Sequence, residues 1–198
     1  MIIYGEKGGY IMKNDEEKSE LEKTVFHGAH GTPELKKDEK NRFLGEFAER
    51  VICYLNYNQL VEPGIYPEVV DAIKSNEAKK LVISREVELN QAQDYIKIAK
   101  NNGLKFKRVD SPEHKGEISL IVASNKAVDI EEKSIMNRRE KLKKKGIADN
   151  IIDGVGKKLC PNCWKKLKEK AEEELINYKK MSWIEKLAGE KCIKCDND

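Results

Sequence analysis

Four neighbouring segments decide the fold: KKLVIS at residues 79–84, LNQAQDYIKIAKNNG at 89–103, LKFKRV at 104–109 and ISLIVAS at 118–124. The second has apolar residues at steps of three and four, which indicates a helix, and Gly103 is a suitable C-terminal cap. The other three are short apolar runs typical of strands. A strand, a crossover helix and further strands predict a right-handed unit of an α/β layer.

The preceding residues are expected to add one strand and one helix. Residues 43–60 fit a helical period, but RVICYL at 50–55 is also a compact β-branched and aromatic run. We favour a strand over 47–55, because three strands alone would leave a sheet edge unpaired. Tyr66-Pro67-Glu68 then begins a helix with proline in its first turn. The expected fold class is α/β, a mixed four-stranded sheet with helices in the order β-α-β-α-β-β.

Composition hides a strong asymmetry of charge. The 198 residues are 37% charged and carry +3 overall. Residues 133–170 hold 13 Lys and Arg against 4 Asp and Glu, so this part carries +9 and the remainder −6. An acidic partner is therefore expected to meet residues 133–170.

The N-terminal residues predict no ordered structure. Residues 1–30 lack an apolar period, so we expect a disordered segment. Lys7-Gly8-Gly9 can be encoded by a ribosome-binding sequence, which makes Met12 a candidate for the true start. His27 and His30 flank Gly28-Ala29 and read as loop histidines, not metal ligands. Without a secretory signal or an apolar run of bilayer length, the chain is expected to be cytosolic, with reduced cysteines.

Several spaced motifs point to one family. They are GTPE at 31–34, FLGEF at 43–47, ERV at 49–51, YPE at 66–68, YIKIA at 95–99, LIVAS at 120–124 and AVDI at 127–130. Residues 31–131 resemble the YueI-like family, a bacterial domain of unknown function. The resemblance implies a mixed sheet like that of Bacillus-type chorismate mutase, similar to ribosomal and kink-turn RNA-binding sandwiches. Those RNA-binding relatives carry Gly-Asn-Glu where this chain has GIYPE at 64–68, a departure that argues against direct RNA recognition at this edge.

Nothing in the sequence predicts catalysis. The family implies no catalytic residues. The loop at residues 110–116 gathers an acid, a hydroxyl, a histidine and a lysine, but no paired base and nucleophile, so it reads as a solvated turn. Cys53 lies within the apolar run at 50–55 and is expected to be a buried thiol. We therefore expect a protein that is not an enzyme.

Residues 132–156 are expected to form a basic helix and a linker. A helix is predicted over 130–145, and its basic side chains could bind RNA or DNA: Arg138, Arg139, Lys141, Lys143, Lys144 and Lys145. No aromatic residue is interleaved with them, so such binding would be to backbone phosphates. A solvated linker helix is the alternative.

Two C-x-x-C pairs, 28 residues apart, give the strongest chemical signal. The four cysteines would be the ligands of one structural Zn(II), whose tetrahedral coordination shell four thiolates fill. They are Cys160, Cys163, Cys192 and Cys195. A redox dithiol and unligated thiols are the alternatives. Residues 157–198 are then a helical zinc hairpin, with one helix over 164–176 and a second opened by a capping box at SWIE, 182–185. Metal removal is expected to unfold this segment and leave the α/β core intact.

The sequence is compatible with two classes of binding protein. The first is a nucleic-acid or ribosome-associated binding protein. The second is a protein-interaction adaptor or homo-oligomerising module that docks through the apolar residues Trp164, Leu167, Trp183 and Leu187. Salt dependence separates the two classes, since only phosphate binding weakens steeply as salt rises.

Overall fold

The computed structural model describes residues 37–110 and 117–192. The chain divides after Lys37, and Asp38–Asp198 is one compact unit. Several sequence predictions lie outside the described residues. They are the disordered segment 1–30 with His27 and His30, the start at Met12, most of the turn at 110–116, and Cys195.

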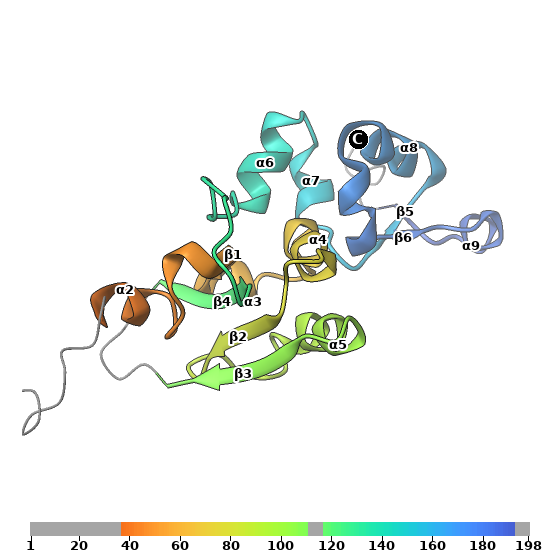
Figure 1. Ribbon diagram of the computed structural model, residues 1–198. Coiled ribbons are helices and arrows are strands. Elements are labelled where there is room, and N and C mark those ends of the chain that lie inside the picture. The colour runs from red at the N-terminus through yellow and green to blue at the C-terminus, as the bar shows by residue number, and fades with distance from the viewer. Residues whose placement is uncertain (1–36, 111–116, 193–198) are drawn as a thin grey trace, which may run out of the picture. The chain divides into compact units, whose positions relative to one another are not determined.

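The predicted mixed four-stranded sheet is confirmed (Figure 1). Its strands are β1 (Val51–Asn56), β2 (Lys80–Ser84), β3 (Lys105–Val109) and β4 (Ile118–Ala123), in the spatial order β1-β4-β2-β3. β2 and β3 are parallel, and β4 runs antiparallel to both β1 and β2. All six residues of β4 are buried, as expected of a strand with neighbours on both edges and side chains packed on both faces.

Helices cover one face of the sheet. They are α3 (Tyr57–Val61), α4 (Pro67–Lys74) and α5 (Gln93–Asn101). Apolar side chains of α4 and α5 form the main core with β1, β2 and β4. Proline begins α4 as predicted, and Gly103 follows α5 at φ 75°, a left-handed conformation that suits glycine. On the opposite face, Leu44 packs with the strand residues whose side chains point away from these helices, among them Val82 and Ile121.

Residues 43–60 combine a turn, a strand and a short helix. The 3₁₀ turn η2 (Ala48–Arg50) precedes β1, so the strand predicted over 47–55 begins later, at Val51. Leu44 and Gly45 both have positive φ, which breaks a helix in the segment after α2 (Lys37–Arg42). Asn56 then caps α3 through a reciprocal pair of hydrogen bonds with Gln59, so the chain turns directly from strand to helix.

Two predicted helices are shorter than expected. The helix expected over 89–103 begins at Gln93, because a turn at Glu88–Gln91 precedes it. The basic helix expected over 130–145 is limited to α6 (Arg138–Lys144). Residues before it are extended, since Ser134 bridges to Tyr54 and the Tyr54 N–H donates to Lys133 O at 3.0 Å. This segment covers the outer edge of β1.

The remaining elements form a second apolar cluster, here called the C-terminal module (residues 138–192). After α6 come α7 (Asp149–Ile152), β5 (Lys158–Leu159), α8 (Pro161–Ala171), η3 (Glu172–Asn177), β6 (Lys179–Lys180) and α9 (Trp183–Leu187). The helix predicted over 164–176 starts at Pro161 and tightens to 3₁₀ at Glu172. The chain returns through β6, which pairs parallel with β5, so a short β ladder accompanies the two predicted helices.

Among the described helices, none is both long and apolar enough to cross a bilayer.

Candidate metal centre

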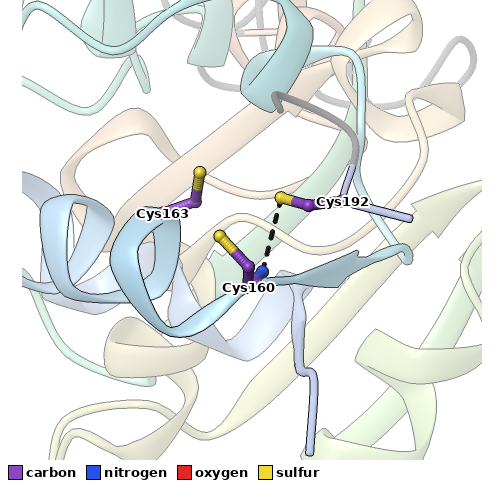
Figure 2. A group of neighbouring side chains, drawn as sticks. All are labelled: Cys160, Cys163 and Cys192. Atoms are coloured by element: carbon purple, nitrogen blue, oxygen red, sulfur yellow. Dashed lines mark hydrogen bonds between the residues drawn. The ribbon is translucent and has the colours of Figure 1, made fainter. Parts of the chain in front are cut away.

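Three of the four predicted ligands come together in the C-terminal module. Cys160 precedes α8, and Cys163 lies in the first turn of that helix, whose first position is Pro161. Cys192 arrives from the segment after α9. The three Sγ atoms lie within 4.8 Å of one another, and all three residues are buried. Figure 2 shows the sulfur atoms turned toward a common space.

This geometry fits a thiolate metal site. With a Zn–S bond of about 2.3 Å, the sulfur atoms of a tetrahedral site are about 3.8 Å apart. The backbone N–H of Cys160 donates to Cys192 Sγ at 3.4 Å, a contact that favours a negatively charged sulfur. Burial and hydrogen bonds with the two neighbouring thiols raise the pKa of Cys163. A bound cation would instead lower the pKa of Cys163, because positive charge favours the thiolate form.

Apolar side chains enclose the cysteines. Leu159, Leu167 and Met181 are buried in the same cluster as the three thiols. An enclosed site with protein ligands is typical of structural metal sites, since a catalytic metal needs an open position for substrate. The described residues bring three ligands together, and the fourth predicted ligand, Cys195, lies outside them.

A lysine that sequence reasoning missed ties α9 to β5. Lys158 Nζ lies 2.6 Å from Glu185 Oε1 and 2.7 Å from Glu190 Oε2. Glu185 also forms the predicted capping box: its carboxylate accepts from Ser182 N at 2.7 Å, and its own N–H donates to Ser182 Oγ at 3.3 Å. The hydrogen bonds from Lys158 and Ser182 lower the pKa of Glu185 to about 2. Lys158 and Glu190 each lie two residues from a cysteine, so this pair links the two segments that carry Cys160 and Cys192.

Comparison with known proteins identifies the preceding α/β domain. The uncharacterized protein YueI of Bacillus subtilis (strain 168) is 30% identical over 104 residues, which are 52% of this chain and 79% of YueI. The crystal structure of the YueI protein from Bacillus subtilis matches with a TM-score of 0.50 at 27% identity, covering 60% of this chain and 94% of that one. Residues 18–134 match the family described as protein of unknown function (DUF1694). The chain belongs to the DUF1694 family. The predicted resemblance to YueI-like proteins is confirmed, and the candidate metal centre lies beyond the DUF1694 region.

Arg138, predicted to face phosphate, is instead buried where the C-terminal module packs on the DUF1694 region. Its side chain is only 4% exposed, and its guanidinium lies 4.5 Å from the centre of the Tyr66 ring. It donates to Pro63 O at 2.6 Å and pairs with Glu174 at 3.4 Å. Arg138 therefore offers little surface to a phosphate, and its guanidinium contacts groups of the folded chain.

Lys141 is also drawn into this junction. Its ammonium lies 2.7 Å from Glu174 and 2.8 Å from Glu68 of the DUF1694 region. Burial opposes the charged form, but hydrogen bonds to the two carboxylates outweigh it and raise the pKa of Lys141. Glu174 has no exposed surface, so Arg138 and Lys141 take the place of water around its carboxylate.

The other predicted phosphate ligands are more exposed, and most of them are paired. Arg139 lies 2.5 Å from Asp153, Lys143 lies 3.3 Å from Asp149, and Lys145 lies 2.5 Å from Glu173. Lys144 instead has its Nζ 3.7 Å from Met136 Sδ. The segment that looks strongly basic in sequence is therefore largely neutralised by carboxylates of the folded chain.

Asn177 makes the most specific contact between the DUF1694 region and the C-terminal module. Its side-chain amide accepts from Ile65 N and donates to Ile65 O, both at 2.8 Å, and it donates to Glu174 at 2.9 Å. The backbone of Ile65 is thus bonded as if by another strand. No sequence signal marks Asn177, because its partner lies 112 residues away.

The four predicted docking residues separate into two groups. Leu167 is fully buried and Trp164 packs against the same cluster, so these two belong to the interior of the module. Trp183 and Leu187 are 71% and 76% exposed, and Ile184 of the same helix is also exposed. Among the described residues of the C-terminal module, the exposed large apolar side chains are therefore these three of α9 and Ile176 of η3.

Cys53 is buried, as predicted. Burial, reinforced by the nearby charge of Glu68, raises the pKa of its thiol to about 12. It packs in the core of the sheet with Leu55 and Val122, so its role is that of a small apolar side chain.

Proposed function

We propose that this DUF1694 protein is a non-catalytic binding protein whose C-terminal module is held by one structural Zn(II). The ligands are Cys160, Cys163 and Cys192, with Cys195 completing the shell. The mutual approach of three buried sulfur atoms within 4.8 Å supports this proposal. Four thiolates leave no open coordination position, so the metal stabilises a fold and performs no reaction.

The bound partner is a protein, not a nucleic acid. The observation that carries this choice is the pairing of the basic segment: each of Arg138, Arg139, Lys141, Lys143 and Lys145 has a carboxylate within 3.4 Å. A phosphate backbone would have to displace those carboxylates. The sequence also implies a likeness to RNA-binding sandwiches. That likeness supplies no other residue that would contact a nucleic acid.

The docking surface is α9. A row of exposed apolar side chains on one short helix suits an apolar groove of a partner protein, with tryptophan as the anchor. These side chains are Trp183, Ile184 and Leu187. A stable dimer needs about 800 Å² from each copy. An aromatic side chain buries about 150–250 Å². One such helix is therefore suited to a transient partner more than to self-association.

Capture from the native host tests this function. Full-length protein is used as bait, together with a Trp183→Ala variant and a Tyr57→Ala control, which removes an exposed aromatic residue elsewhere. The proposal predicts a protein retained by the parent and the control, lost by Trp183→Ala, and insensitive to added salt. Retention of RNA or DNA that weakens with salt, and persists in Trp183→Ala, would establish the nucleic-acid function instead.

A further inference from the structure

The two outer edges of the sheet differ in whether another segment pairs with them. Residues 133–134 pair with β1 and cover that edge. β3 pairs only with β2 among the described strands. At the two ends of β3, Lys105 N donates to Lys79 O and Val109 O accepts from Arg85 N, so the backbone groups of these residues point toward β2. Along a strand, successive residues direct their N–H and C=O groups to opposite edges, so those of Phe106 and Arg108 point outward. Within residues 37–110 and 117–192, β3 thus has outward backbone groups without a hydrogen-bond partner, the kind of groups that accept an added strand.

An apolar groove runs beside this open edge, between β3 and α5. It has a volume of about 350 Å³ and is lined by Leu89, Asn90, Gln93, Ile96, Lys100 and Phe106. Leu89 is 47% exposed, and the Phe106 side chain is half-buried. A groove with an apolar floor and a polar rim, next to free backbone groups, can receive alternate side chains of an extended peptide.

Positive charge at this edge is left without counter-charge. Lys100, Lys105 and Lys107 are exposed, and no carboxylate of the described residues lies within 4 Å of their ammonium groups. This differs from the segment 138–145, in which most cations are paired. Lys105 and Lys107 occupy the strand positions opposite in face to Phe106, because side chains alternate along a strand.

These features together specify a ligand. We propose that the β3 edge binds an extended peptide segment in which apolar residues alternate with Asp or Glu. Its backbone would pair with Phe106 and Arg108, its apolar side chains would enter the groove, and its carboxylates would face Lys105 and Lys107. The site lies within the DUF1694 region and does not depend on α9 or on the metal. A nucleic acid could use the lysines, but not the strand edge and the apolar groove together.

The test uses the full chain and a capped, fluorescently labelled peptide that alternates Val and Glu. The matched control peptide alternates Val and Lys. Fluorescence anisotropy should show saturable binding of the Glu peptide only. A Lys105→Glu/Lys107→Glu variant should weaken that binding by about tenfold or more and gain affinity for the Lys peptide. The matched control is Lys179→Glu/Lys180→Glu, which reverses two exposed charges on β6 and should change neither affinity.

Backbone pairing has a separate readout. Binding of the Glu peptide should slow hydrogen exchange at the amides of Phe106 and Arg108, and Leu89→Ser should weaken binding without loss of fold. The proposal is overturned if the Glu peptide does not bind, if both peptides bind equally, or if the two amides are not protected. It is also overturned if Trp183→Ala abolishes binding, because the peptide would then occupy the α9 surface. If the parent captures no protein through α9 but still binds the Glu peptide, the proposed function alone is refuted.

Discussion

Glu174 is a carboxylate with no exposed surface, and two cations from α6 meet it. Arg138 lies 3.4 Å and Lys141 2.7 Å from its oxygens, and Asn177 donates to it at 2.9 Å. The sequence offers only the acidic run Glu172-Glu173-Glu174, which predicts an exposed end of a helix. Burial of the third residue follows from tertiary packing alone, so sequence reasoning had no means to single it out.

A Glu174→Gln substitution is therefore expected to be strongly destabilising. It leaves the buried Arg138 without its counter-charge, whereas Lys141 keeps Glu68, and breaking a buried ion pair typically costs about 3–5 kcal/mol. The control Glu172→Gln removes a charge that is 67% exposed, and it should change the free energy of unfolding by no more than about 0.5 kcal/mol. Urea denaturation measures both. Equal effects of the two substitutions would contradict the buried network.

Cys53 gives a prediction about pH. Its folded pKa of about 12 lies above the ordinary thiol value of 9.0, so the native state favours the protonated form. This contribution to stability is complete below about pH 9 and is lost as the pH rises toward 12, by up to about 1.4 kcal/mol per pH unit. The free energy of unfolding of the parent should therefore fall toward that of Cys53→Ala between pH 9 and 11. A constant difference between the two proteins would show that the thiol is not desolvated.

At the scale of elements, local signals placed most of the structure. Proline at the start of α4, Gly103 after α5 and the capping box of α9 each act through neighbouring residues, and each was predicted. The basic helix was predicted too long because Ser134 pairs with Tyr54, 80 residues earlier in the chain, and so draws the preceding residues into an extended conformation. Strand pairing between distant segments overrides a local helical pattern.

Gly64 provides a test of how the C-terminal module packs on the DUF1694 region. Gly64 and Gly103 both have positive φ, at 86° and 75°, so alanine at either position should cost about 1–2 kcal/mol. A Cβ at Gly64 would also lie 2.6 Å from Val155 Cγ1 and 2.7 Å from Asn177 Oδ1, whereas a Cβ at Gly103 has nothing within 4 Å. Gly64→Ala should cost about 1–3 kcal/mol more than Gly103→Ala in thermal or urea unfolding. Equal costs would mean that Val155 and Asn177 do not pack against Gly64.

Over the whole molecule, the sheet and the cysteine cluster were predictable, whereas the junction between them was not. Short apolar runs predict strands, and C-x-x-C spacing predicts that two thiols lie close together, because both patterns are local. Arg138, Glu174 and Asn177 join two parts of the chain through contacts that have no sequence pattern. The basic side chains predicted to face a partner over residues 138–145 are, in large part, paired with carboxylates of the same chain.

This junction alters the expected result of metal removal. The sequence predicts that a chelator unfolds the C-terminal segment and leaves the α/β core intact. The buried pairs predict more: when α8 and η3 unfold, Arg138 and Lys141 lose Glu174, so the sheet should also become less stable. Hydrogen exchange after chelation should show lost protection in α8 and faster exchange in β4. Unchanged exchange in β4 would show that the two parts are independent.

The central claim, that the cysteines bind one metal ion, is tested most directly by the metal content of protein purified without added metal. Elemental analysis should find one zinc per chain in the parent and in the Cys53→Ala control, and well under one in Cys163→Ser. The control removes a buried thiol outside the cluster, so it separates loss of a ligand from general loss of cysteine. Well under one zinc per chain in the parent, or full occupancy in Cys163→Ser, would contradict the assignment of the site.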